Sequence, residues 1–354
     1  MNKVQSSNFN GSASTSAEFF FQVPRREVLN NEGVGFGVIG LGMGAARAKL
    51  IHATDGARLV AVADIDEERG QKAAGEYGID WDEDYRRMLE RADIDVVMVM
   101  TPSGTHADFG EVVAQAGKHV GSTKPIDVTL ESADRLIKAC DDAGVTLAVD
   151  FESRYMDDNV RMGEAIREGR LGKPILGEVR LKWFRADAYY DGWHGTWKYD
   201  GGGSLINQTV HQIDQLIWYM GQPKTVCGQI GVFTHEIETE DLGMAMIKFE
   251  NGAVGTILGT TTFPTSLPPR VEVHGDKGAA IVSGHKVELW EIPGESADDA
   301  YENTGPKNII EDMIRVVRDG GTPRVDGAEA KRSLSLILGV YESAKNGSAP
   351  VQFS

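Results

Sequence analysis

The stretch that decides the fold reads Phe36-Gly37-Val38-Ile39-Gly40-Leu41-Gly42-Met43-Gly44-Ala45. Its apolar start predicts a buried strand that enters a glycine-rich turn, and the residues over 45–52 predict a helix. Outward from this unit, short apolar strands alternate with helical stretches; the strands are expected at 59–63, 94–100, 119–121 and 145–149, and the helices at 67–77, 106–116 and 130–142. Alternation with short connections predicts an α/β domain, a doubly wound parallel sheet with helices on both faces.

The glycine turn has the context that a dinucleotide site requires. A predicted strand precedes it, a predicted helix follows it, and an acid, Asp64, lies roughly 20 residues further on. We expect Gly40 to allow the tight turn, Gly42 to let the backbone approach a pyrophosphate, and Ala45 to permit close helix–strand packing. The free N–H groups of the helix N-terminus suit the phosphates. The Asp64 carboxylate would accept hydrogen bonds from the ribose hydroxyls and repel a 2′-phosphate, so NAD is favoured over NADP as the cofactor.

The second half of the chain follows another pattern. Alternation of period 2 begins near residue 175, and Asn251-Gly252 and Asp276-Lys277-Gly278 are hairpin signals. Together with a long helix over 204–220 and terminal helices over 308–318 and 328–346, this predicts an α+β domain with an open, largely antiparallel sheet. We therefore divide the chain into a flexible N-terminal extension (1–32), a dinucleotide-binding domain (33–150) and a substrate-binding and oligomerisation domain with terminal helices (151–354).

Composition narrows the partners and the compartment. The 354 residues carry 36 Lys and Arg against 53 Asp and Glu, a net charge of −17, which argues against nucleic acid or an anionic membrane. Two cysteines cannot build a disulfide framework or a multi-cysteine zinc site. No apolar run is long enough to span a bilayer, and Arg25-Arg26 is followed by no apolar export segment. We expect a cytoplasmic protein without a metal.

Polar residues near two further strand ends and on one helix are candidates for chemistry. Thr101-Pro102-Ser103 and Lys124-Pro125 follow strands, where ligands of such sheets bind. Asn207, His211 and Asp214 recur at i, i+4 and i+7 of the predicted helix. A solvated stripe of an amphipathic helix would also explain the spacing, but imidazole suits proton transfer near neutral pH. A metal is disfavoured because the amide is a poor ligand.

Taken together, these motifs resemble the Gfo/Idh/MocA oxidoreductases, from about residue 35 to the C-terminus. The order of the motifs carries the resemblance: Gly40-x-Gly42, Thr101-Pro102 with His106, Lys124-Pro125, and the run from the triple glycine to Asp214. The resemblance implies a Rossmann domain and an NAD(P)-dependent dehydrogenase or reductase acting on a secondary carbinol of a sugar, inositol or related derivative. Two positions depart from the family pattern: Thr123 replaces a usual Glu, and Asn207 replaces a frequent Asp.

The resemblance also implies roles for individual residues. Lys124 and His211 become the catalytic pair, His211 as acid and base and Lys124 polarising the substrate oxygen. Aromatic rings before the triple glycine offer faces for a sugar. The expected substrate-binding residues are Arg154, Tyr155, Trp193, Trp197, Asn207 and Asp214. The expected cofactor-binding residues are Gly40, Gly42, Met43, Gly44, Asp64, Thr101, Pro102, Ser103, His106, Lys124 and Pro125.

Two other functions stay open at this point, together with the state of assembly. A non-catalytic dinucleotide-binding sensor or regulator would keep the fold, and Asn207 and Thr123 are compatible with it. A methyltransferase also begins with a glycine-rich turn and a strand-end acid, but the downstream motifs disfavour it. Apolar residues of the second sheet, among them Met244, Met246, Val271 and Val273, predict a homo-oligomer, a dimer or tetramer built through these sheets.

Overall fold

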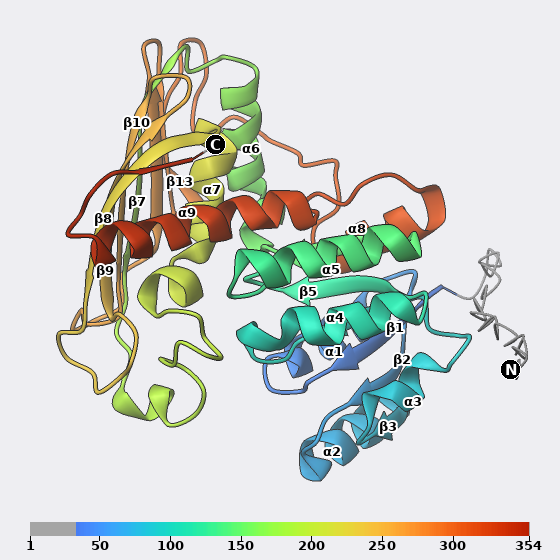
Figure 1. Cartoon of the computed structure of the whole chain (residues 1–354). Helices are drawn as coiled ribbons and strands as arrows, with labels where there is room; N and C mark the ends of the chain where they lie inside the picture. The colour runs from blue at the N-terminus through green and yellow to red at the C-terminus, as the bar shows by residue number, and fades with distance from the viewer. Residues whose placement is uncertain (1–32, 354) are drawn as a thin grey trace, which may run out of the picture.

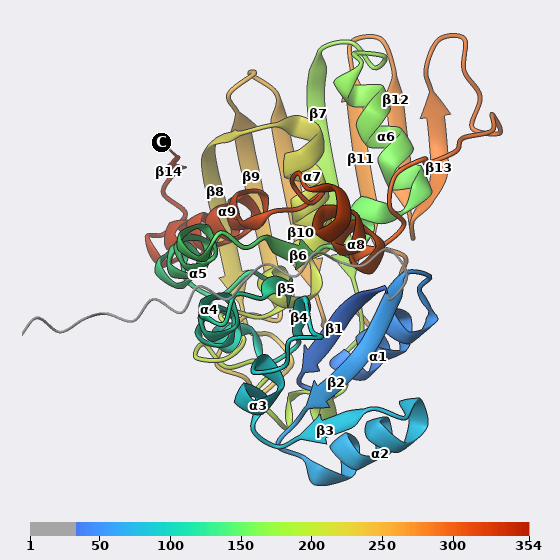
Figure 2. The same cartoon turned by 90° about the vertical axis from the view of Figure 1, so that its right-hand side faces the viewer.

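A computed structural model describes residues 33–353, and the predicted N-terminal extension lies outside them. The first sheet has six parallel strands in the order β3-β2-β1-β4-β5-β6 (labelled in Figure 2). Their bounds are β1 Val34–Ile39, β2 Ala57–Ala63, β3 Asp80–Asp82, β4 Val96–Val99, β5 His119–Thr123 and β6 Leu147–Asp150. The helices between them are α1 Gly44–Ala53, α2 Glu67–Tyr77, α3 Tyr85–Leu89, α4 His106–Gln115 and α5 Leu130–Ala143. The predicted doubly wound α/β sheet is confirmed; β3 and α3 were not predicted.

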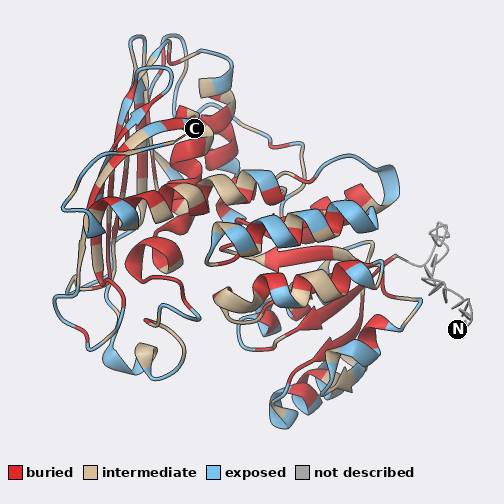
Figure 3. Ribbon diagram, in the orientation of Figure 1, coloured by how far each residue is buried: buried red, intermediate tan, exposed pale blue. Residues whose placement is uncertain are grey.

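The apolar runs of this sheet are buried throughout, as a parallel sheet covered on both faces requires. All residues of β1, β4 and β6 are buried (Figure 3). Strand order reverses between β1 and β4, because β2 lies on one side of β1 and β4 on the other. Ligands of open α/β sheets bind at such a switch point, outside the carboxyl ends of the strands.

The second sheet has eight strands in the order β13-β12-β11-β7-β10-β9-β8-β14. β7 and β10 pair in parallel and the other pairs are antiparallel, so the expected largely antiparallel sheet is confirmed. The strands are β7 Pro174–Lys182, β8 Pro223–Gly231, β9 Leu242–Phe249, β10 Val254–Thr260, β11 Arg270–Gly275, β12 Ala279–Ser283, β13 Lys286–Glu291 and β14 Val351–Gln352. The helices of this half are α6 Asp157–Arg167, α7 Val210–Met220, α8 Ile309–Asp319 and α9 Gly327–Lys345, with short helical turns η1 Ser103–Thr105, η2 Glu152–Tyr155, η3 Asp187–Tyr190 and η4 Ser204–Gln208.

Helices α6, α7 and α9 lie on one face of this sheet, and within the described residues no helix lies on the other (Figures 1 and 2). Met244 and Met246 are 51% and 67% exposed on the uncovered face. Val271 and Val273 are instead buried in the core beneath the helices, which corrects their assignment to the outer surface. The alternation of buried and exposed residues along β9 matches a sheet with one covered face.

The predicted helix over 204–220 is wrong in one important respect, because it is two elements. η4 is a π-helical turn, closed by the Thr209 amide on the Ser204 carbonyl, and α7 starts only at Val210. The buried carboxylate of Glu240 accepts the amides of Gly203 and Leu205 at 2.8 and 2.9 Å and so caps the turn. The break turns Asn207 out of the register that an unbroken helix would give it with Asp214.

The chain also returns to the first sheet late in the sequence. Ile309, Ile310 and Met313 of α8 are buried in one cluster with Val34 and Phe36 of β1. A boundary at residue 150 therefore separates the two sheets but leaves α8 packed on the N-terminal one (Figure 2). No helix among residues 33–353 is long and apolar enough to cross a membrane.

Candidate functional site

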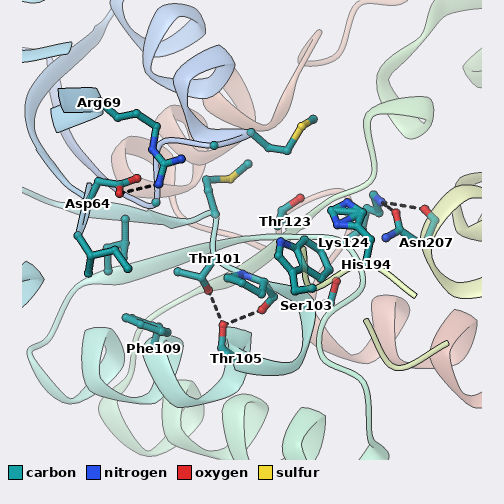
Figure 4. A pocket seen from close by; sticks show the side chains of 18 of the residues that line it. Asp64, Arg69, Thr101, Ser103, Thr105, Phe109, Thr123, Lys124, His194 and Asn207 are labelled. Carbon is teal, nitrogen blue, oxygen red and sulfur yellow. Dashed lines mark hydrogen bonds and ion pairs between the residues drawn. The ribbon is translucent and has the colours of Figure 1, made fainter. Parts of the chain in front are cut away.

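A cavity of about 840 Å³ lies at the switch point of the first sheet and is lined on its other side by residues of the second half of the chain. Its lining includes Gly40 and Gly42 from the glycine turn, Lys124 after β5, and Asn207 and His211 from η4 and α7. Figure 4 shows Asp64 and Arg69 at one end and Lys124, His194 and Asn207 at the other. Residues far apart in the sequence thus meet around one space.

The glycine turn has the shape that a pyrophosphate needs. Gly40 has φ +88°, and a Cβ there would lie 2.8 Å from the Met100 carbonyl oxygen. A Cβ on Gly42 would meet nothing within 4 Å, so backbone faces open space. Gly44, not Ala45, makes the close helix–strand contact: a Cβ on Gly44 would meet Val38 at 3.1 Å, whereas Ala45 is exposed. Ala45 is therefore corrected as the packing residue, whereas Gly44, which does not line the cavity, stays a predicted cofactor contact.

Asp64 directly follows β2 and lines the cavity although it is only 8% exposed. One carboxylate oxygen accepts the Leu41 amide at 2.5 Å, and the other accepts the Asp66 amide at 2.7 Å and the Arg69 guanidinium at 3.2 Å. The carboxylate is therefore held in place beside the glycine turn. Met43, on the same turn, lines the cavity and is 77% exposed.

The residues after β4 include three that line the cavity and one buried histidine that does not. Thr101, Pro102 and Ser103 line the cavity. His106 is fully buried, and its ring nitrogens lie 2.7 Å from the Pro125 carbonyl oxygen and 2.9 Å from that of Thr101. Neither His106 nor Pro125 lines the cavity, so the structure adds no support to their predicted cofactor contacts. His106 instead ties the loop after β4 to the loop after β5.

Lys124 reaches across the cavity to the second half of the chain. Its Nζ donates to the Asn207 carbonyl oxygen at 2.9 Å and lies 3.5 Å from Asn207 Oδ1 (Figure 4). Burial lowers the pKa of Lys124, and the carboxylates of Asp200, Glu152 and Asp150 partly oppose that effect. The Nζ of Lys124 lies where an oxygen of a bound ligand could accept a hydrogen bond from it.

Asp200 stands behind Asn207, and the sequence analysis did not identify it. Asn207 Nδ2 donates to Asp200 Oδ1 at 2.5 Å, and the Gly195 amide donates to Asp200 Oδ2 at 2.9 Å. Asp200 is 1% exposed, and burial raises its pKa to about 6. Because the amide nitrogen of Asn207 faces this carboxylate, its Oδ1 faces Lys124.

His211 lines the same cavity as Lys124. Its Nδ1 is buried and has no hydrogen-bond partner among the described residues, and its ring meets the edge of Phe151 with centroids 5.8 Å apart. Burial first, and then the positive charge of Lys124, hold the pKa of His211 well below its usual range. The imidazole is therefore neutral near pH 7 and able to accept a proton.

Four predicted substrate contacts lie away from the cavity. Arg154 and Asp214 form a buried ion pair, with Nε and one Nη 2.6 and 3.0 Å from the carboxylate. The Tyr155 hydroxyl donates to buried Asp312 at 3.1 Å. Trp197 meets the edge of the Tyr341 ring, with centroids 5.5 Å apart. None of the four lines the cavity, so the structure adds no support to their predicted role in substrate binding.

The segment after β7 supplies the remaining wall. Trp193 lines the cavity as expected, and so does His194, whose pKa is lowered to about 4, by burial first and then by Lys124 and Arg185. Sequence reasoning missed Trp183, Arg185 and Gln208, which also line it. No local pattern marks them, because they come from irregular backbone and from the π-helical turn. Residues 33–353 hold no group of His, Cys, Asp and Glu suited to a metal ion.

Comparison with known proteins gives consistent matches over both halves. Residues 34–151 match the GFO/IDH/MocA oxidoreductase family with its NAD-binding Rossmann fold, and residues 160–281 match the GFO/IDH/MocA C-terminal domain. The scyllo-inositol 2-dehydrogenase (NAD(+)) of Bacillus subtilis (strain 168) is 29% identical over 89% of this chain and 95% of its own length. The WlbA dehydrogenase from Bordetella pertussis, solved in complex with NADH and UDP-GlcNAcA, is 31% identical with a TM-score of 0.83, over 91% of this chain and 99% of that one.

Proposed function

The chain belongs to the Gfo/Idh/MocA oxidoreductase family, and from this premise we propose that it is an NAD-dependent dehydrogenase acting on a secondary alcohol of a sugar, an inositol or a derivative of one. The proteins that it resembles include enzymes of three bacteria that are named as inositol 2-dehydrogenases. The observation that carries the proposal is the meeting of Lys124, His211 and the glycine turn around one cavity.

The residues present fit NAD. The open space in front of Gly42 would hold the pyrophosphate, and the fixed carboxylate of Asp64 would accept ribose hydroxyls while repelling a 2′-phosphate. Thr101, Pro102 and Ser103 line the wall beyond the turn, toward Lys124. When bound, NAD supplies the hydride acceptor or donor.

The proton chemistry falls to residues of the chain. His211 is neutral near pH 7, so it can accept the proton of the substrate hydroxyl during oxidation and return it during reduction. Lys124 donates a hydrogen bond to the same oxygen as it gains carbonyl character. Asn207, an amide, cannot take a proton; it orients Lys124 and offers its own hydrogen bonds to substrate hydroxyls.

One experiment separates this function from that of a sensor or regulator without turnover. Purified protein is incubated with NAD and a panel of inositols, aldoses and sugar derivatives, and the absorbance of the reduced cofactor is followed. We expect reduction with at least one member, and faster turnover with NAD than with NADP. Tight cofactor binding with no reduction across the panel, and no reoxidation of NADH by keto sugars, would favour the sensor.

We also propose that two copies pack through the uncovered face of the second sheet. Met244, Met246 and Val254 are between 48% and 67% exposed there, an apolar surface that a partner could cover. Light scattering should give at least twice the mass of one chain at micromolar concentration. Replacement of Met244 and Met246 by Lys should shift the protein toward a monomer, whereas a monomeric wild-type protein would overturn this assembly.

A further inference from the structure

The two ends of the cavity differ in which charges line them. Asp64 and Glu83 are the carboxylates in the described lining, and both belong to the end near β2 and β3. At the other end the lining holds two cations, Lys124 and Arg185. The carboxylates close to Lys124 do not line the cavity. The end of the cavity that holds Lys124 and Arg185, called the reaction end below, is therefore lined by positive charge and, among the described residues, by no carboxylate.

Those nearby carboxylates already have partners. Asp150 and Glu152 form ion pairs with Arg47. Asp200 accepts from the Gly195 amide and from Asn207. None of these three carboxylates forms an ion pair with Arg185, so none of them neutralises its charge.

Arg185 is held in position but is not neutralised. Its guanidinium carbon lies 4.8 Å from the centroid of the Trp183 ring and 5.1 Å from that of Tyr189. Its Nη1 donates to the neighbouring Phe184 carbonyl at 3.0 Å, while its Nε is buried and has no hydrogen-bond partner within residues 33–353. No carboxylate within this range pairs with it. A guanidinium has five N–H donors, so most of its capacity is left for a ligand.

Arg185 is also close enough to the reaction centre to act on it electrostatically. Its charge lowers the pKa of Lys124 and contributes to the lowered pKa of His194. Two cations that repel one another across a partly buried space are stabilised when an anion binds between them. Planar guanidinium suits a carboxylate or a phosphate, which it binds through two parallel hydrogen bonds.

We propose that the substrate of this site is an anionic sugar derivative, whose carboxylate or phosphate group is bound by Arg185 while its reacting hydroxyl faces Lys124 and His211. This inference rests on the proposed dehydrogenase function and adds the charge of its substrate. Arg185 is then a specificity-determining residue, and neutral sugars of the same shape are poorer ligands.

The test compares ligands that differ in charge. NADH-saturated protein is titrated with D-glucose, D-glucuronate, D-glucose 6-phosphate and UDP-glucuronate, and binding is followed by the fluorescence of Trp183 and Trp193 in the cavity wall and by calorimetry. We expect at least one anion to bind roughly tenfold or more tightly than glucose. The member that binds identifies the source: glucuronate a sugar carboxylate, glucose 6-phosphate a phosphate monoester, and UDP-glucuronate alone a nucleotide diphosphate.

Three variants decide whether Arg185 causes the preference. In Arg185→Gln the ratio of anion to glucose affinity should fall about 10- to 100-fold, the cost of losing a hydrogen bond to a charged group. Arg185→Lys should recover part of the anion preference, because lysine restores the positive charge but not the planar pair of N–H donors of the guanidinium. Lys182→Gln is the matched control: it removes one positive charge from β7, its Nζ lies over the Phe263 ring, and it does not line the cavity. The preference should survive in Lys182→Gln.

The outcomes separate this inference from the proposed function. No preference for any anion in the wild type, or an equal preference in a folded Arg185→Gln variant, overturns the anionic substrate. A lost preference in Lys182→Gln as well overturns the role of Arg185, since the general field of the domain would then explain it. Failure of hydride transfer with every ligand, charged or neutral, overturns the proposed dehydrogenase function. The binding comparison still tests the preference for anions, because it does not require turnover.

Discussion

Two arginines mark the two ends of the cavity, and their surroundings differ. Arg69 is half exposed and pairs with Asp64 at 3.2 Å and with Asp66 at 3.6 Å. Arg185 lies between two aromatic rings and pairs with no carboxylate in the described part of the chain. At the first end positive charge is cancelled, which suits neutral ribose hydroxyls. At the second end it is kept, which suits an anion and an oxygen that gains negative charge.

The ends also differ in how they are built. Asp64 and the glycine turn belong to one strand–turn–helix–strand unit, and the Leu41 amide ties them together. Lys124 and Asn207 are 83 residues apart, and their hydrogen bond joins the two halves of the molecule. The first end therefore forms with one local unit, whereas the second depends on how the halves pack. If cofactor binding and chemistry divide along this line, substitutions at the two ends should change different measured quantities.

The largest effect is expected at the reaction end. His211→Ala should lower kcat about 10²- to 10⁴-fold, the usual contribution of a positioned acid or base, and change the affinity for NADH little. His52→Ala is the matched control, because His52 is exposed and packs beside Tyr77 outside the cavity. Steady-state kinetics and NADH fluorescence measure the two quantities. Equal losses of kcat and NADH affinity in His211→Ala would show that the two ends are not separable.

A smaller effect is expected from exchanging the Asn207 amide, which faces Lys124, and the Asp200 acid behind it. Asn207→Asp would place a second carboxylate against Asp200, where Nδ2 now lies 2.5 Å from Oδ1, and should lower kcat about 10- to 100-fold. The double variant Asp200→Asn with Asn207→Asp restores one amide and one acid. Its kcat should exceed that of Asn207→Asp by about tenfold, as a double-mutant cycle would detect for coupled residues. Additive losses would show that the pair does not act together.

What the sequence could predict follows the same division between local and long-range structure. The positions of Gly40, Gly42 and Asp64 in the cavity wall were predictable, because they depend on a strand, a turn and a helix that follow one another. Lys124 and His211 were found through the order of motifs. They line one cavity, and their catalytic role stays a proposal.

The misses have a common physical cause. The i, i+4, i+7 spacing of Asn207, His211 and Asp214 implied one helical face, but η4 is π-helical, and Asp214 pairs with Arg154 in the core. Asp200 and Arg185 carry no local signal, because their surroundings are made by packing between segments distant in the chain. An unpaired arginine can be recognised only when every acid around it has been placed.

The pH dependence should show a further, moderate effect. Burial raises the pKa of Asp200 to about 6, so below that pH its carboxyl is protonated and no longer fixes the Asn207 amide. The rate should fall up to about tenfold per pH unit as the pH drops below 6 and be level above 6. Protonation of His211, whose pKa is lowered by burial, should add to the fall at still lower pH. Stability runs the other way: a folded-state pKa above the unfolded value of 3.8 favours the fold below 3.8, and this contribution is lost as pH rises through 6.

Two variants identify the group that causes the fall in rate below pH 6, the acid limb of the pH profile. Asp200→Asn should abolish it, because no group at this position then titrates. Asp150→Asn is the control, since burial also raises the pKa of Asp150 to about 6 although Asp150 is bound to Arg47 and does not line the cavity. The limb should persist in Asp150→Asn. A limb that vanishes in Asp150→Asn but persists in Asp200→Asn would assign it to Asp150 and contradict the role given to Asp200.

The smallest effect is expected where charge is already cancelled. Arg69→Gln removes a half-exposed partner of Asp64, and such pairs contribute about 0–1 kcal/mol, so NAD affinity should change less than about fivefold. Affinity for NADP should fall further than that for NAD, because the Asp64 charge is then unopposed near a 2′-phosphate. Calorimetry with both cofactors measures this. If Arg69→Gln changed cofactor affinity as strongly as Arg185→Gln changes anion affinity, pairing with a carboxylate would not be what distinguishes the two ends.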